Sequence, residues 1–547
     1  MELGTILPQE RIDAMAEAGA WPDRLLVDYL EDALAGNADG PAVTTYNGED
    51  GSVITLNYAD LDRLSRRVAL RLLDMGIEPG DVVALQLPNW WQFNVLVAAC
   101  SRIGAIFNPL MPIFRERELV YMLGFAEAKV LLTPERFRGF DYRPMVEGMR
   151  PELPHLREVV YVGGGGADGF DARMVSEPLE EVAGADDRLQ SRRPTPLDVY
   201  ELIYTSGTTG QPKGVMHIPN TTLGHLMTWI PHHDLTSEDV FLMASPLGHQ
   251  TGVLYGVLLP IMLGAHSVLQ DRWQPPQAAE IIQRHRCSFT IGATPFLSDI
   301  VYMPNVADFD LSSLRTFVSA GAPIPPKLVQ DAAAKFSFRV LSGWGMTECG
   351  CPCICDPDVG PDKVCNSDGK PLPWSEVIVL DENGQEAPRG VEGELKVRGS
   401  TLFVGYLKRP ELHGRDADGW FDTGDRAWMA EDGYIRISGR SKDIIIRGGE
   451  NIPVVELEDV LYRHPAVRDA AVVGVPDDRL GERGCAYVTL KPDASLDMEG
   501  MLAHFAEKGT AKQYWPEHLQ ILEDMPRTPS GKIQKFKLRE MAQALAR

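Results

Sequence analysis

The sequence lacks a hydrophobic run long enough to cross a bilayer. The apolar stretch 253–265 is shorter than the roughly 20 residues of a membrane helix and contains Pro260. The first residues have neither the basic nor the apolar segment of a signal peptide. The 8 cysteines among 547 residues are too few for a disulfide framework. We therefore expect a protein of the reducing cytoplasm without an integral membrane segment.

The chain also has fewer basic than acidic residues. The chain has 53 Lys and Arg against 77 Asp and Glu, a net charge of −24. This balance argues against nucleic acid or an anionic membrane as a partner. Residues 439–547, however, carry 16 basic and 17 acidic residues, so the deficit lies almost wholly in the first 438 residues. A near-neutral C-terminal part suits contact with anionic ligands, although chance composition would look the same.

The order of apolar segments predicts an α/β fold. Residues 82–87 are typical of a buried strand, residues 90–105 of a buried helix, and residues 106–109 of the next strand. Strands that alternate with helices indicate parallel sheets covered by helices.

The length exceeds that of a single core, so two or more domains are expected. We predict a large N-terminal domain at 1–438, built of several subdomains with mixed and parallel sheets. A glycine-led polar hinge follows at 439–443, and a small mobile α+β domain at 444–547.

A loop rich in glycine and hydroxyl residues follows the apolar stretch 199–204. Glycines let backbone N–H groups approach an anion, hydroxyls add donors, and Lys213 adds positive charge, so the loop predicts a phosphate site. It is not a Walker A loop, because Pro212 precedes the lysine and Gly214 follows it. A flexible linker is the alternative, but linkers seldom follow an apolar strand. The candidate residues are Thr205, Ser206, Gly207, Thr208, Thr209, Gly210 and Lys213.

This loop resembles the signature loop of the acyl-adenylate-forming, AMP-binding enzymes, and the resemblance runs from about residue 40 to about residue 540. It implies that residues 319–323 border an adenine. It further implies that Trp344 stacks on the adenine, Thr347 bonds the α-phosphate and Glu348 holds Mg²⁺. Residues 420–425 match the ribose element of the family. The implied nucleotide residues are Gly321, Ala322, Pro323, Trp344, Gly345, Met346, Thr347, Glu348, Asp425 and Arg440.

The segment 526–535 matches the family loop whose lysine enters the active site. By this resemblance Lys532 bridges the carboxylate and phosphate oxygens and stabilises charge during adenylation. The small domain then rotates about Lys442, and the glycine-containing loop 447–451 meets the pantetheine arm of coenzyme A. The implied coenzyme A residues are Lys442, Gly448, Gly449 and Glu450.

The resemblance therefore implies ATP, Mg²⁺ and coenzyme A as cofactors and a carboxylic acid as substrate. Acetate-using relatives close the acyl pocket with a tryptophan where this chain has Gly345, so we expect a larger acid, medium-chain or alicyclic. His249 lies between two segments that line the acyl side by analogy and is expected to cap the carboxylate. The implied catalytic residues are Thr205, Lys213, His249, Glu348 and Lys532.

Cysteines alternate with other residues at 349, 351, 353 and 355, and a fifth stands at 365. In a regular strand this spacing would place all four on one face, as suits a buried apolar surface. Zinc sites more often combine Cys-x₂₋₄-Cys pairs from two places. Oxidative sensitivity is a further alternative, because the series starts directly after Glu348.

The leading interpretation is an ATP-dependent, AMP-forming acyl-CoA ligase. One alternative is a free-standing adenylation enzyme that loads a carrier protein; it is weakened because no carrier domain follows Lys532. Another is a non-catalytic regulator that binds nucleotides or acyl-CoA, against which the intact candidate residues argue. A homodimer is left open.

Overall fold

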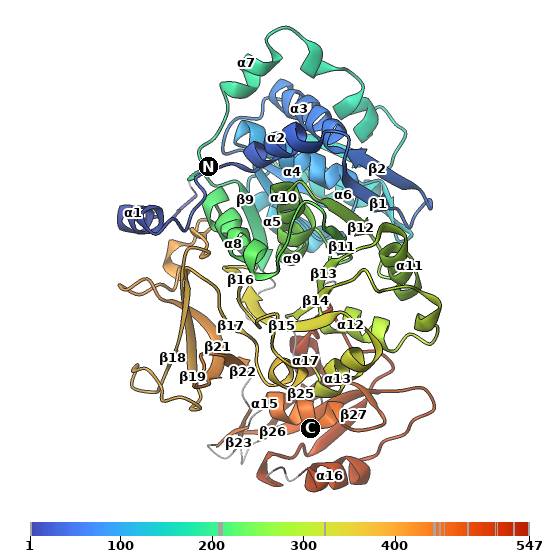
Figure 1. Ribbon diagram of the computed structural model, residues 1–547, viewed down its shortest axis with the longest axis vertical. Helices are drawn as coiled ribbons and strands as arrows, with labels where there is room; N and C mark the ends of the chain where they lie inside the picture. The colour runs from blue at the N-terminus through green and yellow to red at the C-terminus, as the bar shows by residue number, and fades with distance from the viewer. Residues whose placement is uncertain are drawn as a thin grey trace.

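The computed structural model describes residues 3–205, 212–321, 324–440, 445–447, 450–452, 454–477, 481–508, 510, 512–528 and 531–544. Figure 1 shows a large body, coloured blue to light orange, with the C-terminal segments gathered in red and dark orange at one end. The described part of the chain contains no helix long and apolar enough to span a membrane.

The largest sheet of the body is mostly parallel. Its strands pair in the order β17 (Lys370–Pro371), β16 (Gly350–Ile354), β15 (Arg339–Met346), β14 (Thr316–Ala320), β13 (Phe289–Gly292), β11 (Val240–Met243), β12 (His266–Gln270), β1 (Pro41–Tyr46) and β2 (Val53–Asn57). The pairs from β15 through β1 are parallel, whereas β16, β17 and β2 join antiparallel at the two edges. The carboxyl ends of the parallel strands therefore meet at one edge of the sheet.

A second sheet lies beside the first. Its order is β20 (Gly405–Tyr406), β10 (Lys213–His217), β9 (Glu201–Thr205), β4 (Ile106–Pro109), β3 (Val82–Leu85), β5 (Val130–Pro134) and β8 (Glu158–Val162). All four residues of β3 are buried, as expected for a parallel strand covered on both faces. The predicted strand–helix–strand order at residues 82–109 is confirmed, with the helix α4 at Trp91–Ile103.

Helices cover both sheets and close the body. They are α1 (Gln9–Glu17), α2 (Leu26–Asn37), α3 (Tyr58–Asp74), α4, α5 (Glu116–Phe125), α6 (Arg143–Met149), α7 (Ala185–Gln190), α8 (Pro219–His232), α9 (Gln250–Val253), α10 (Leu259–Leu263), α11 (Pro275–His285), α12 (Thr294–Val301), α13 (Pro326–Lys335) and α14 (Pro361–Cys365). Short helical turns are η1 (Arg150–Glu152), η2 (Asp171–Val175), η3 (Leu179–Glu181), η4 (Leu254–Leu258), η5 (Val306–Asp308) and η6 (Pro410–Leu412). A hairpin joins β6 (Arg136–Phe137) and β7 (Phe140–Asp141).

An antiparallel sheet completes the body. It has the order β18 (Ser375–Leu380), β19 (Gly393–Gly399), β21 (Phe421–Met429) and β22 (Ile435–Arg440). The last strand of this sheet, β22, runs through Gly439 and Arg440. The first two residues of the predicted hinge therefore belong to a strand, and residues 441–443 lie outside the described part.

The C-terminal segments build a small sheet with its own packing on both faces. Its strands are β23 (Ile445–Arg447), β24 (Glu450–Ile452), β25 (Val467–Asp477), β26 (Gly481–Leu490) and β27 (His518–Ile521). Its helices are α15 (Val454–Tyr462), α16 (Met498–Glu507), η7 (Lys512–Tyr514) and α17 (Lys535–Gln543). Alternate residues of β25 enter two separate apolar clusters, Val472 one and Val473 the other. The mixed α/β class with a small α+β unit is confirmed.

Candidate active site

A cavity of about 70 Å³ opens at the carboxyl edge of the large sheet. The loops and helix starts that follow β11, β13, β14 and β15 supply most of its wall, because parallel strands bring their carboxyl ends together. The wall consists of Ser245, His249, Gln250, Thr251, Leu254, Tyr255, Ile291, Gly292, Ala293, Ala320, Gly321, Gly345, Met346, Thr347, Gly350, Cys351 and Lys532. Of these, Lys532 alone comes from the C-terminal unit.

Lys532 packs against Gly321 at the end of β14. A Cβ placed on Gly321 would lie 2.8 Å from Lys532 Cε, and the φ of Gly321 is +84°, a conformation that favours glycine. Two residues that are 211 positions apart, and that sequence reasoning assigned to one site, are thus brought together by the fold. Ala322 and Pro323 lie outside the described residues.

The candidate adenine and ribose residues share a hydrogen bond. Trp344 Nε1 donates to Asp425 Oδ2 at 2.9 Å, and both side chains are buried. Asp425 stands opposite Arg440 in the ladder between β21 and β22. The carbonyl of Thr347 accepts a 2.8 Å hydrogen bond from His217 Nε2. Burial lowers the pKa of His217 to about 4, so the ring is neutral near pH 7 and holds this backbone without adding charge.

Lys213 and Glu348 meet through a tyrosine. Lys213 Nζ donates to Tyr406 Oη at 2.9 Å, and the tyrosine hydroxyl donates to Glu348 Oε1 at 2.7 Å. Burial, and then the nearby Glu348 carboxylate, raise the pKa of Tyr406. Sequence reasoning assigned no chemistry to Tyr406. Its pairing with Val215 across β20 and β10 is a long-range contact, so the local sequence gives no signal of it.

His249 starts α9 and faces the cavity. Its Nδ1 accepts from the backbone N–H of Thr251 at 3.3 Å, which leaves Nε2 as the protonated nitrogen. Burial, and then the charge of Lys532, lower the pKa of His249 to about 3. The His249 ring is therefore neutral near pH 7 and can donate a hydrogen bond through Nε2. It is too weakly basic to take up a proton at this pH.

Gly345 does not leave open space for an acyl group, contrary to the expectation from the sequence. A Cβ on Gly345 would overlap the carbonyl oxygen of Gly350 and lie 2.6 Å from Cys351 Cα. Gly345 therefore allows the backbone of β16 to approach closely, and that backbone fills the space. Leu254 and Tyr255 also line the cavity, so side chains other than residue 345 help to set its size.

The prediction that four cysteines share one face is wrong. Trp344 pairs with Cys353 and Met346 pairs with Gly350, so β16 carries an extra residue between these two pairs. Such a bulge shifts the alternation of side chains. Cys349 and Cys353 pack in one apolar cluster, whereas Cys351 and Cys355 pack in another. All four are buried as free thiols, and burial raises the pKa of each.

Glu348 suits Mg²⁺ as a single carboxylate ligand. Mg²⁺ is typically held by one or two carboxylates together with phosphate oxygens, rather than by a cage of protein side chains. Within the described ranges no group of three or more His, Cys, Asp or Glu residues could hold a metal ion. Glu348 is linked through Tyr406 to Lys213, which places a cation and a carboxylate on the same tyrosine hydroxyl.

Two family matches span most of the chain. The AMP-binding enzyme family matches residues 30–407, and its C-terminal domain matches residues 456–532. The chain belongs to the AMP-binding enzyme family. The medium-chain fatty-acid–CoA ligase of Escherichia coli K12 is 38% identical over 99% of this chain and 94% of its own length. Like this relative, the present chain is an AMP-forming acyl-CoA ligase, which is an acid–thiol ligase.

Solved structures of AMP-binding enzymes have the same fold. The anthranilate CoA ligase AuaEII, solved with anthranoyl-AMP, superposes with a TM-score of 0.84 and 25% identity, covering 97% of this chain and 99% of that one. ATP-bound MatB from Rhodopseudomonas palustris gives a TM-score of 0.82 and 27% identity, with coverage of 95% and 99%.

The other residues predicted for the site of this AMP-binding enzyme lie outside the cavity wall or outside the described part of the chain. Thr205 stands opposite Lys213 where β9 pairs with β10, outside the wall of the cavity. The backbone of Glu450 is in β24. The predicted residues outside the described part are Ser206, Gly207, Thr208, Thr209, Gly210, Ala322, Pro323, Lys442, Gly448 and Gly449.

Proposed function

We propose that this enzyme joins a medium-chain or alicyclic carboxylic acid, of the cyclohexanecarboxylate type, to coenzyme A. In the first step the acid attacks the α-phosphorus of ATP and gives an acyl-adenylate and pyrophosphate. In the second step the thiol of coenzyme A displaces AMP and gives the thioester. The observation that carries the proposal is the entry of Lys532 into the cavity beside Gly321.

The chain's own residues supply positioning and electrostatics for the first step. Lys532 would stabilise charge that spreads over carboxylate and phosphate oxygens. Neutral His249 would donate to the acid's carboxylate. The Asp425 carboxylate would receive the ribose hydroxyls. Mg²⁺ held by Glu348 would neutralise phosphate charge when bound.

The acid is proposed from similarity and from the cavity wall. The Escherichia coli relative named for medium-chain fatty acids covers nearly the whole chain. Leu254, Tyr255 and Ile291 give the acyl side a largely apolar surface. An apolar wall favours an alkyl or alicyclic group over acetate, because burial of each additional CH₂ contributes about 0.8 kcal/mol.

The test is a panel of acids with ATP, Mg²⁺ and coenzyme A. Acids from acetate to laurate, with benzoate and cyclohexanecarboxylate, would be supplied to the purified protein, and products identified by mass. We expect thioesters from C6–C10 acids or from cyclohexanecarboxylate. Lys532→Ala should lower adenylation by at least about 100-fold. Lys537→Ala removes an exposed lysine of α17 and should leave the rate unchanged.

Other outcomes of the panel separate the alternatives. Acyl-adenylate without thioester would indicate a carrier protein as the natural acceptor. Thioester from acetate alone would contradict the proposed acid class. Neither product from any acid, in a folded protein that still binds ATP, would contradict catalysis on this class of substrate and favour a regulatory role.

A further inference from the structure

The turn that carries Lys532 is closed by a small set of hydrogen bonds. Thr528 N donates to Lys532 O at 2.7 Å, and Lys532 N donates to Thr528 Oγ1 at 3.0 Å. Gly531 N donates to Thr528 O at 2.9 Å, and Arg527 pairs with Ile533 as an isolated bridge. These bonds hold Gly531 and Lys532 against Thr528, but they do not attach these residues to the sheet of the C-terminal unit.

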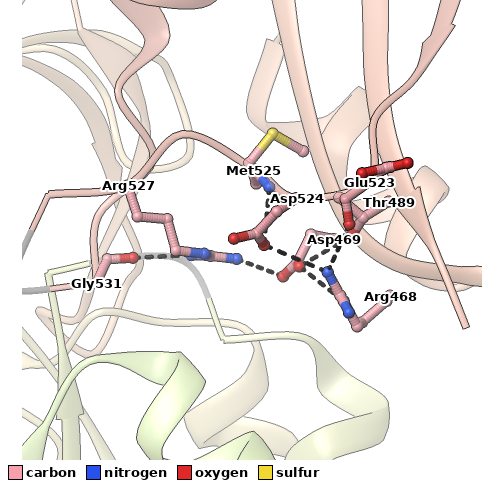
Figure 2. Close-up of polar contacts among 8 residues, drawn as sticks. All are labelled: Arg468, Asp469, Thr489, Glu523, Asp524, Met525, Arg527 and Gly531. Carbon is pink, nitrogen blue, oxygen red and sulfur yellow. Dashed lines mark hydrogen bonds and ion pairs between the residues drawn. The ribbon is translucent and has the colours of Figure 1, made fainter. Parts of the chain in front are cut away.

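Ile533 packs against the apolar cluster of β25 and β26, and Arg527 adds the polar attachment. Its Nη1 donates to the carbonyl oxygen of Gly531 at 2.8 Å, directly before Lys532. Its Nη2 forms an ion pair with Asp469 Oδ1 of β25 at 2.5 Å. Figure 2 shows the guanidinium between the two partners, with the turn on one side and the strand on the other.

Asp469 is itself held in place. Its Oδ2 accepts from Thr489 Oγ1 of β26 at 2.9 Å and from Arg468 Nε at 3.3 Å (Figure 2). The side chains of Asp469 and Arg527 are 19% and 23% exposed, so water screens the pair only in part. An anchored carboxylate, an arginine fork and a backbone carbonyl thus form a continuous connection from β25 to Lys532.

This connection faces the body of the enzyme. A Cβ on Gly531 would lie 3.4 Å from Ala293 Cβ, so the turn contacts the start of α12. Asp299 of α12 is also close: its pKa is raised mainly by burial, and the charges of Asp469, Arg527 and Arg468 act on it as well. The Arg527–Asp469 pair therefore stands where the C-terminal unit meets the wall of the cavity.

We propose that Arg527 and Asp469 are positioning residues that set the place of Lys532 for the adenylation step. The inference rests on the proposed role of Lys532. Arginine suits this task because its planar fork offers N–H donors in a fixed geometry, one for the carboxylate and another for the carbonyl. A lysine at 527 has one ammonium and could not hold both partners in the same arrangement.

A purely structural role makes a different prediction, and the two half-reactions separate them. Lys532 is needed when the adenylate forms and not when coenzyme A attacks a finished adenylate. A displaced Lys532 should therefore slow pyrophosphate exchange and spare the second step. A loosened fold should slow both steps together and lower the melting temperature.

The experiment uses the full chain and two assays. Adenylation is followed by ATP–pyrophosphate exchange with a reactive acid, and thioester formation by supplying synthetic acyl-adenylate with coenzyme A. Arg527→Met should lower the exchange rate about 10- to 100-fold, since a displacement of about 1 Å can cost that much. Arg527→Lys and Asp469→Asn should give smaller losses, about 3- to 10-fold. All three should keep the second step within about twofold of wild type.

Arg468→Met is the matched control. Arg468 also bonds Asp469, but it points to Asp524 and the Glu523 carbonyl and contacts no residue of the turn 527–533 in the described chain. Its 3.3 Å bond to Asp469 is longer than the 2.9 Å bond from Thr489, which the variant keeps, so both half-reactions should stay within about twofold. Hydrogen exchange adds a readout that does not depend on activity: the Lys532 amide should exchange faster in Arg527→Met than in wild type or Arg468→Met.

The outcomes are distinct. Equal losses in both half-reactions, or none in either, with unchanged exchange of the Lys532 amide, would overturn the inference. If wild type itself forms no adenylate with any acid, the proposed function fails instead. The exchange comparison then still decides whether Arg527 holds the turn.

Discussion

At the scale of single residues, Tyr406 joins Lys213 and Glu348, the two charged groups that we propose for the triphosphate and its Mg²⁺. Its hydroxyl accepts from Lys213 and donates to Glu348, which is 3% exposed. When a buried carboxylate loses such a donor, the free energy of unfolding falls by roughly 1–3 kcal/mol, because no other group replaces the lost hydrogen bond. The tyrosine therefore contributes both to stability and to the direction of the two charges.

Tyr406→Phe tests this link. We expect about tenfold slower adenylation with a higher KM for MgATP, and a free energy of unfolding about 1–3 kcal/mol lower. Kinetics and denaturant unfolding measure the two effects. Tyr434→Phe is the matched control, because Tyr434 also donates to a carboxylate, Asp356 at 2.8 Å, whereas the bonds to Lys213 and Glu348 belong to Tyr406. An equal loss of activity in both variants would contradict a specific role for Tyr406.

Residues to which the family motifs assign a role were predictable, and residues that act through distant partners were not. Lys532, Gly321 and His249 were named from sequence and line one cavity. Tyr406 and Arg527 were missed because their partners, Lys213 and Asp469, are far away along the chain. Hydrogen bonds between distant side chains depend on the tertiary fold, and composition or local spacing does not encode them.

At the scale of elements, β9 and α9 meet through a buried acid. Gln250 Nε2 of α9 donates to Glu201 Oε2 of β9 at 3.3 Å, and Glu201 is fully buried. Burial raises the pKa of Glu201 from 4.5 to about 8. The carboxyl is therefore largely protonated near pH 7, and β9 carries a neutral group beneath the start of α9.

The raised pKa of Glu201 makes the folded state less stable as pH rises. Below pH 4.5 the acid is protonated in both the folded and the unfolded chain, so this part of the stability is fully present. As pH rises towards 8 the unfolded chain ionises first, and the free energy of unfolding falls by about 1.4 kcal/mol per unit of pKa difference. Glu201→Gln should remove this fall between pH 5 and pH 8.

Urea unfolding midpoints at each pH provide the measurement. Glu180→Gln is the control: burial opposes ionisation there, but bonds to Arg67 prevail and the pKa of Glu180 is lowered. The contribution of Glu180 is present above its usual pKa and is lost only as pH falls below it. Its replacement should therefore leave the slope between pH 5 and pH 8 intact. An unchanged slope in Glu201→Gln would show that Glu201 ionises normally.

Element types were more predictable than element details. The apolar runs at 82–85 and 106–109 are strands because four consecutive buried residues suit a parallel sheet. The bulge of β16 was not predictable, since alternating cysteines would equally suit a regular strand. Its presence follows from how Gly345 admits the neighbouring backbone, which is a property of the packed sheet.

At the scale of the whole molecule, one arginine contacts both units. Arg436 Nη1 of β22 lies 3.6 Å from Asp368 Oδ1 of the body, and its Nη2 lies 3.6 Å from Asp459 Oδ2 of α15. The side chains of Arg436 and Asp459 are 12% and 18% exposed. This arrangement, with Lys532 inside the cavity, is the one that we propose for the adenylation step.

Asp459→Asn should shift the balance between arrangements of the two units. An ion pair of this exposure contributes about 1 kcal/mol, so adenylation should slow about 2- to 5-fold while the second half-reaction is unchanged or faster. The same two assays measure it. Glu507→Gln, which changes an exposed acid of α16, is the control. Slower catalysis in both steps would point to misfolding rather than to the docking of the units.

The two-part architecture was predicted from the length of the chain and from the polar, glycine-led segment at 439–443. The docked orientation did not, because it depends on a few contacts such as Arg436 with Asp459 and Lys532 with Gly321. Each is weak by itself, and an orientation held by weak contacts leaves no periodic pattern in the sequence.

All eight cysteines are free and buried. A native molecule with no exposed thiol is a ready substrate for site-directed labelling. One cysteine introduced on the surface of each unit would react with a maleimide dye far faster than the native eight, without a cysteine-free background. Energy transfer between two such dyes could then follow the orientation of the units in single molecules during turnover.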